Sequence, residues 1–264
     1  MIEPFHQLCY ESENKSVCCR GITFNSGDSF ATFLTDEVSQ RLEDTEEKLA
    51  FESHLTGLVG TGFAKENLQE ILESDITEER NWAAGEALAE AWLEYVHKIT
   101  WPWNMERDKR TPKASLPGAD LVGFQECDKE IRLVLGEVKS SSQEKYPPNV
   151  MTGKSGMEHQ IDKLATDLSI VARLLRWLFP RCKGNQFEAS FNSAVQLFLE
   201  SGNKAVSLFG VLIRDTEPNE LDLKNRGQTL KKCIQSPTSC DLLSLYLPFS
   251  LNELSERIQG VVPS

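Results

Sequence analysis

The sequence contains no apolar run that approaches the roughly 20 residues needed for a membrane-spanning helix. Its opening stretch, MIEPFHQLCYESENK, also lacks the basic and apolar blocks of a signal peptide. The seven cysteines are scattered and include no CxxC pair, so neither a disulfide framework nor a zinc site is indicated. We therefore expect a cytoplasmic protein with reduced thiols and no membrane partner.

Positive charge is also scarce. The chain has 28 Lys and Arg residues against 40 Asp and Glu residues, which gives a formal net charge of −12. Because phosphate binding depends on Lys and Arg, this balance argues against a protein that coats nucleic acid by itself. Any contact with nucleic acid must be local or shared with a partner. The sequence also lacks a recognisable element for reading DNA sequence, such as a helix-turn-helix or a zinc finger.

The length and composition allow one large domain with an elaboration, since 264 residues with 40% hydrophobic content can bury a sizeable core. We divide the chain into an N-terminal strand and acidic helical elaboration (residues 1–74) and a main domain (residues 75–264). The expected elements of the main domain are a helix over 75–97, a hairpin over 118–141, a helix over 156–179, a strand over 204–215, a helix over 219–235, a strand over 240–249 and a helix over 251–262. This order predicts an α/β fold in which a mixed β-sheet is flanked by helices.

The hairpin GADLVGFQECDKEIRLVLGEVKSS places charges in an otherwise apolar segment. Side chains alternate between faces in a strand, so Glu137 and Lys139 point the same way, while Val134 and Val138 point the other way. Both faces are apolar up to the end of this strand, which is typical of an interior strand. Asp120 begins the preceding strand, so antiparallel pairing would bring it beside Glu137.

Two carboxylates about 4 Å apart would repel by about 4 kcal/mol at an effective dielectric near 20. A divalent cation removes this cost, and hard oxygen ligands suit Mg²⁺, with Mn²⁺ as an alternative. We expect Asp120 and Glu137 to be metal ligands. Lys139 would then lie beside the ion, where it can orient or help to deprotonate an attacking water.

A third carboxylate is expected from the helix NWAAGEALAEAWLEYV. A rotation of about 100° per residue places Glu86 inside the apolar stripe of this helix, with Glu90 at the flank and Glu94 outside it. Glu86 is therefore predicted to face the sheet and to contribute to the metal site.

The stretches GEALAE, PGAD and GEVK, in this order, resemble the PD-(D/E)XK nuclease superfamily. The resemblance implies a restriction-endonuclease-like core, with Asp120 and Glu137 as metal ligands, Lys139 as the catalytic lysine and Glu86 as the accessory acid. PGAD stands where the motif has PD, so the assignment of Asp120 rests on its position in the hairpin. Gln160, in GMEHQIDKL, resembles the glutamine found after the lysine strand in RecB-like members.

Over a longer stretch, the pattern GE, GADLVGF, GEVKSS and HQIDKL also resembles the nuclease-like subunit of Hachiman-type bacterial antiphage defence. That resemblance implies a superfamily 2 helicase as protein partner and DNA as substrate. The basic segment RDKRTPK precedes the hairpin and is predicted to contact nucleic-acid phosphates through Arg107, Lys109, Arg110 and Lys113.

Three functional hypotheses remain open from the sequence. The first is a metal-dependent deoxyribonuclease that a helicase partner restrains or delivers. The second is a restriction or repair endonuclease that acts alone, and the third is a non-catalytic docking subunit with a nuclease fold. Glu137 and Lys139 alone could be a solvated ion pair worth about 0 to 1 kcal/mol, so the interpretation rests on the order of all three stretches.

Overall fold

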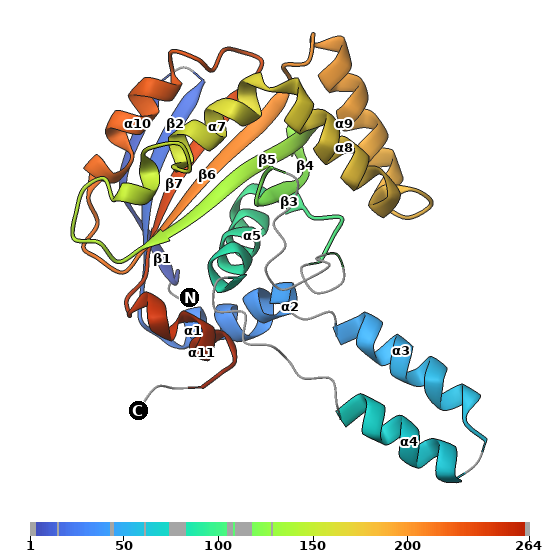
Figure 1. The fold of residues 1–264 in the computed structure, drawn as a ribbon. Helices are drawn as coiled ribbons and strands as arrows, with labels where there is room; N and C mark the ends of the chain where they lie inside the picture. The colour runs from blue at the N-terminus through green and yellow to red at the C-terminus, as the bar shows by residue number, and fades with distance from the viewer. Residues whose placement is uncertain are drawn as a thin grey trace.

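A computed structural model describes residues 4–14, 16–42, 45–60, 62–73, 83–104, 108, 118–127 and 129–261. These residues form a seven-stranded mixed sheet with helices on both faces, which confirms the predicted α/β class (Figure 1). The strands are β1 (His6–Asn14), β2 (Val17–Phe24), β3 (Ile99–Thr100), β4 (Leu121–Cys127), β5 (Glu130–Ser141), β6 (Val206–Arg214) and β7 (Ser239–Tyr246). In the part of the chain that is described, no helix has the length and apolar character needed to cross a membrane.

The strand order is β1-β2-β7-β6-β5-β4-β3. Strands β2, β7, β6 and β5 are mutually parallel, whereas β1, β4 and β3 join the sheet through antiparallel pairs. Because β5 lies between β4 and β6, it is an interior strand, as its apolar faces predicted. The carboxyl ends of the four parallel strands therefore meet at one edge of the sheet.

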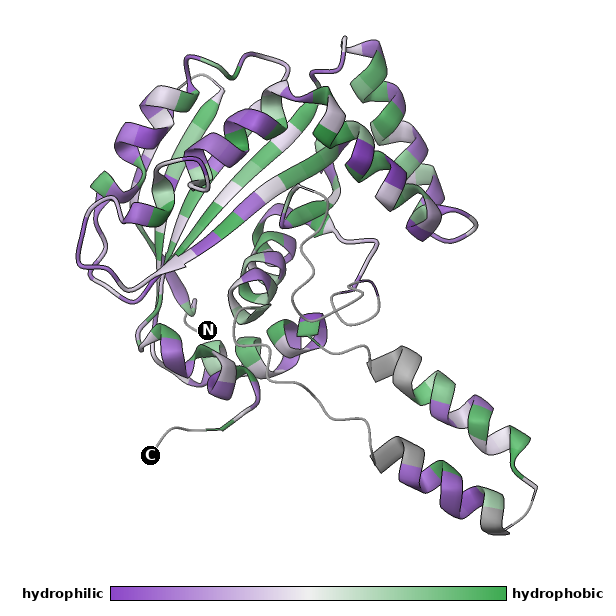
Figure 2. Ribbon diagram, in the orientation of Figure 1, coloured by the Kyte–Doolittle hydropathy of each residue, from purple (hydrophilic) through white to green (hydrophobic). Residues whose placement is uncertain are grey.

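Alternation along β5 divides the core into two layers. Leu133 and Leu135 pack with one group of helices, and Val134 and Val138 pack with the other. The first layer consists of α7 (Met157–Thr166), α8 (Leu168–Cys182), α9 (Glu188–Glu200) and α10 (Lys224–Leu230). The second layer consists of α1 (Asp28–Thr32), a π-helical turn over Phe33–Val38, α2 (Ser39–Leu42), α5 (Ala83–His97) and α11 (Leu254–Ile258). Figure 2 shows that the central strands are mainly hydrophobic and that the end of β5 is hydrophilic.

The N-terminal segment contributes directly to this sheet. β1 and β2 form a hairpin, and β2 pairs in parallel with β7 from the other end of the chain. α3 (Thr45–Leu58) and α4 (Gly62–Glu73) stand apart from the sheet as a helical hairpin (Figure 1). The division at residue 74 stays a prediction, but strands from both sides of it share one sheet.

The predicted helix over 156–179 is wrong, because the structure has two helices there. The helix is interrupted at Asp167, whose backbone is extended. The Asp167 side chain accepts a hydrogen bond of 2.9 Å from the Ser169 amide. Asp167 therefore caps α8, as short acidic side chains commonly do at a helix start. α8 also continues past Pro180 to Cys182, although Pro180 has no N–H group to donate within the helix.

Candidate active site

The β4–β5 hairpin brings Asp120 and Glu137 together at the end of the sheet. Leu121 pairs with Gly136, and the Asp120 amide donates a hydrogen bond of 2.9 Å to the Gly136 carbonyl oxygen. The Asp120 carboxylate also accepts a bond of 2.9 Å from the Val138 amide. This second bond fixes the Asp120 side chain against β5 as β4 begins, so the convergence predicted from the hairpin is present.

Glu137 is a buried acid, with only 7% of its surface exposed. Burial and, second to it, the nearby negative charge of Asp120 raise the pKa of Glu137 to about 7, although Lys139 partly opposes both effects. The two carboxyl groups lie within hydrogen-bonding reach of each other. Glu137 can therefore hold a proton near neutral pH and release it to a competing cation.

Lys139 is the cation closest to this pair among the interactions described. Its Nζ atom donates to Glu137 Oε1 at 2.5 Å, and its side chain is 24% exposed while that of Glu137 is 9% exposed. The pair is thus partly enclosed, unlike the solvated ion pair that the two residues alone could have formed. Lys139 combines a compact positive charge with access to solvent, which is what activation of a water molecule requires.

The position of the pair within the sheet also fits a binding site. Glu137 lies opposite Gly210 and Lys139 opposite Leu212 in the parallel β5–β6 pair. A Cβ atom on Gly210 would come within 2.8 Å of Met157 Sδ, so α7 begins directly over this part of the sheet. Open α/β sheets commonly bind ligands at the carboxyl ends of their parallel strands.

The oxygen ligands at this edge suit a hard divalent cation such as Mg²⁺. Asp120 and Glu137 supply carboxylate oxygens, and Mg²⁺ typically takes one or two carboxylates while keeping several waters. Within the described ranges, no group of three or more His, Cys, Asp or Glu side chains has an arrangement that could hold a metal ion. Asp120 and Glu137 are the two carboxylates that the β4–β5 hairpin brings together.

Glu86 reaches this edge from the other layer. A Cβ atom on its neighbour Gly85 would lie 2.8 Å from Ser140 Oγ, so the first turn of α5 packs against the end of β5. Glu137 and Lys139, however, point to the opposite face of that strand. Glu86 is half-buried, whereas Glu90 is only 2% exposed, so Glu90 is more deeply buried than the helical stripe suggested. A contribution of Glu86 to metal binding stays a prediction.

The remaining predicted residues are less tightly connected to the pair. Gln160 lies in α7, three residues after Met157, and is half-buried. Its side chain makes no hydrogen bond to Asp120, Glu137 or Lys139 in the described structure. Arg107, Lys109, Arg110 and Lys113 lie outside the described residues.

A second charged group at the same edge escaped the sequence analysis. Arg214, at the end of β6, pairs with Asp222 at 3.3 Å, and both side chains are fully buried. The Arg214 guanidinium also donates to the carbonyl oxygens of Ser141 and Gln143, each at 2.7 Å. These bonds hold the chain where it leaves β5. The signal was present in KAVSLFGVLIRD, where a charge ends an apolar run as Glu137 and Lys139 do.

Comparison with known proteins places the chain in a family. No curated protein matches it. The family model described as HamA, however, matches residues 3–259, which is nearly the whole chain. This match spans the β4–β5 hairpin, the helices of both layers and the N-terminal strands. The chain therefore belongs to the HamA family, the family of the Hachiman antiphage defence protein.

Proposed function

We propose that this HamA-family chain is a metal-dependent nuclease that hydrolyses phosphodiester bonds of DNA. The observation that carries the proposal is the convergence of Asp120, buried Glu137 and Lys139 at the carboxyl edge of the parallel strands. The order of the stretches GEALAE, PGAD and GEVK, with its resemblance to PD-(D/E)XK nucleases, supports the same assignment.

Each residue has a role that follows from its position. Asp120 and Glu137 would hold Mg²⁺, or Mn²⁺ in its place, and the ion would supply Lewis-acid polarisation of a phosphate oxygen. Lys139 would orient the attacking water and offset negative charge that develops on the phosphate. The hydrogen bond between Lys139 and Glu137 would keep the ammonium group of Lys139 beside the proposed metal ligand Glu137. Glu86, in the first turn of α5, would be an accessory acid that acts on the metal site through a water molecule at the end of β5.

A cleavage assay tests this proposal. The purified chain is incubated with supercoiled plasmid and with linear duplex, each with Mg²⁺ and with chelator. We expect metal-dependent cutting that falls by roughly 10² or more in Glu137→Gln and Lys139→Ala, the scale typical for loss of a group that stabilises a transition state. Glu130→Gln is the matched control, since Glu130 begins the same strand but its side chain is 54% exposed.

We also propose that a helicase partner delivers DNA to this chain and restrains its cutting. Membership of a defence family and the net charge of −12 support this, since such an acidic chain should bind naked duplex weakly. The α3–α4 hairpin is the candidate partner surface, because it stands apart from the sheet and exposes Leu49, Phe51 and Leu58 on α3.

The two alternatives to this proposal predict different results. A stand-alone endonuclease would cut selected sites as an isolated chain. A docking subunit would protect cells against phage equally well with Glu137→Gln as with the native sequence. Loss of protection in Glu137→Gln but not in Glu130→Gln would favour the nuclease. Retention of partner binding after removal of the α3–α4 hairpin would contradict the assigned partner surface.

A further inference from the structure

Helix α8 has a charge opposite to that of the chain as a whole. Its 15 residues, LSIVARLLRWLFPRC, include Arg173, Arg176 and Arg181 and contain no Asp or Glu. The complete sequence, in contrast, has 40 acidic and 28 basic residues. α8 is therefore a basic element on an acidic protein, and its location decides what that charge could serve.

The first turn of α8 lies beside the candidate active site. A Cβ atom on Gly118 would come within 2.8 Å of Ile170 Cγ2, and Gly118 precedes Asp120 by two residues. Gly118 also has a φ of 119°, a conformation that favours glycine. The close packing of Ile170 against this glycine fixes the start of α8 next to the segment that carries Asp120.

The other end of α8 is fixed to the same hairpin. The Trp177 ring packs edge-on against Trp103, with ring centroids 5.6 Å apart, and the Trp103 indole donates to the Val122 carbonyl oxygen of β4 at 3.0 Å. Arg181 stacks 3.9 Å above the Trp177 ring and pairs with Asp108 at 2.8 Å. Arg181 is therefore used in packing, and Trp103 links this end of α8 to β4.

Arg173 and Arg176 have no such structural role. Both are exposed, and neither forms an ion pair with another residue in the described ranges. They lie one turn apart, separated by about 4.5 Å along the helix axis. Asp167 is the closest acid along the chain, and hydrogen bonds from Ser169 lower its pKa more than Arg173 does. Exposed guanidinium groups of this kind bind phosphate oxygens through two parallel hydrogen bonds.

We propose that Arg173 and Arg176, on the exposed face of α8, bind the phosphate backbone of duplex DNA and guide it to Asp120 and Glu137. This inference rests on the proposed nuclease function, because DNA is the substrate that the function supplies. The start of α8 beside Asp120 favours DNA as the occupant over an acidic protein surface. The net charge of −12 adds to this, since DNA can approach such a chain only along a local basic element.

Binding without metal tests the inference separately from cleavage. The anisotropy of a fluorescent 30-base-pair duplex is measured with the full chain in chelator, over about 20 to 200 mM salt, a range in which phosphate contacts dominate affinity. We expect Arg173→Ala/Arg176→Ala to weaken binding about tenfold at low salt and to reduce the slope of log K against log salt by about 2. Arg173→Lys/Arg176→Lys should keep most of the slope.

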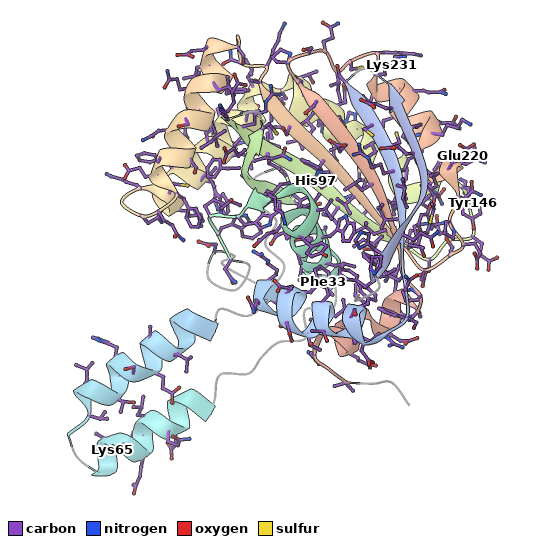
Figure 3. All side chains as sticks on the ribbon, turned by 180° about the vertical axis from the view of Figure 1, so that it is seen from behind. Phe33, Lys65, His97, Tyr146, Glu220 and Lys231 are labelled. Carbon is purple, nitrogen blue, oxygen red and sulfur yellow. The ribbon has the colours of Figure 1, made fainter. Side chains whose placement is uncertain are left out.

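The matched control is Lys231→Ala/Lys232→Ala, which removes the same charge at the end of α10. α10 lies in the same layer of helices as α8 but over β2, near the opposite edge of the sheet (Figure 1), and Figure 3 labels Lys231. Equal effects of the two double variants would overturn the inference, as would a native chain that binds no duplex at the lowest salt. Unchanged DNA binding by Arg173→Ala/Arg176→Ala, with loss of binding to an acidic protein, would assign α8 to that protein instead.

The two proposals can fail independently in these experiments. A chain that binds duplex through α8 but never cuts it with Mg²⁺ would contradict the proposed function and leave the α8 inference standing. A chain that cuts DNA in a Glu137-dependent manner, with the same affinity and salt slope in Arg173→Ala/Arg176→Ala, would do the reverse.

Discussion

Two acid–base pairs lie at the same carboxyl edge of the sheet but have different surroundings. Arg214 and Asp222 are fully buried, and the guanidinium has further hydrogen bonds to the chain that leaves β5. Glu137 and Lys139 keep some exposure, and Glu137 has Asp120 as a second acid beside it. The first pair is balanced by its neighbours, whereas the second has an excess of negative charge.

This difference separates a structural pair from a candidate functional pair. Asp222 Oδ2 also accepts a bond of 2.9 Å from the Tyr246 hydroxyl, so two donors, Arg214 and Tyr246, partly compensate its burial. Burial raises the pKa of Asp222, although Arg214 and Tyr246 act against this rise. Among the described residues, the donor to the Glu137 carboxylate is Lys139, and a cation from solution could compensate the remaining cost of burying this acid.

The largest expected effect comes from breaking the structural pair. Arg214→Met leaves Asp222 buried without its cation and frees the carbonyl oxygens of Ser141 and Gln143. We expect the free energy of unfolding to fall by about 3 to 5 kcal/mol, the range for loss of one partner in a buried pair. Urea denaturation measures this loss.

The control for this variant is Lys224→Ala, which breaks the exposed pair between Lys224 and Glu220. Its expected cost is below about 1 kcal/mol, because solvent already screens the two charges. Equal losses in Arg214→Met and Lys224→Ala would show that burial of the Arg214 pair has no energetic importance.

A smaller effect, with a distinctive pH dependence, is expected at Glu137. Its pKa of about 7 in the folded protein exceeds the ordinary value of 4.5, so the folded state binds more protons than the unfolded state between these values. The contribution of Glu137 to the free energy of unfolding should therefore be most favourable below pH 4.5 and should be lost as the pH rises through 7. The total change is on the order of 3 kcal/mol.

Glu137→Gln should remove this dependence in metal-free buffer and should make the protein more stable than the native chain at pH 8. Urea unfolding at pH 5 and at pH 8, with chelator present, measures the difference. Glu130→Gln should leave the pH dependence of the native chain in place. A native and a Glu137→Gln chain with the same pH profile would show that Glu137 is ionised at neutral pH without a cation.

The smallest of these effects is expected at Tyr246. Tyr246→Phe removes the hydroxyl that donates to Asp222 and that lies 3.0 Å from the Tyr10 hydroxyl, while Arg214 stays in place. We expect a loss of about 1 to 2 kcal/mol, measured by urea unfolding, because one buried acceptor loses one of its donors. A loss as large as that of Arg214→Met would mean that the tyrosine compensates the burial of Asp222 as much as the arginine does.

The sequence predicted the α/β class and the convergence of Asp120 with Glu137 because both depend on local patterns. Alternation along β5 placed Glu137 and Lys139 on one face, and the short loop of the hairpin brought Asp120 alongside. The break between α7 and α8 was not foreseen, because apolar spacing continues across Asp167 and only the capping bond reveals the interruption.

Contacts between segments that are distant in the sequence could not be predicted from these local patterns. The pairing of β2 with β7 joins segments more than 200 residues apart, and nothing in either strand specifies its neighbour. The positions of Glu86 and Glu90 also depend on how α5 rotates when it packs on the sheet through Gly85. The partner of Arg214 comes from a separate turn containing Asp222, so the sequence showed the charge without its partner.

The most direct test of the central claim is the binding of a divalent cation by Asp120 and Glu137. Titration of the chain with Mn²⁺, followed by the electron paramagnetic resonance signal of the free ion, measures binding without requiring a partner or DNA. The account predicts a site that is present in the native chain and in Glu130→Gln, and lost in Asp120→Asn and Glu137→Gln. Equal Mn²⁺ binding by the native chain and Glu137→Gln, or no binding by either, would contradict it.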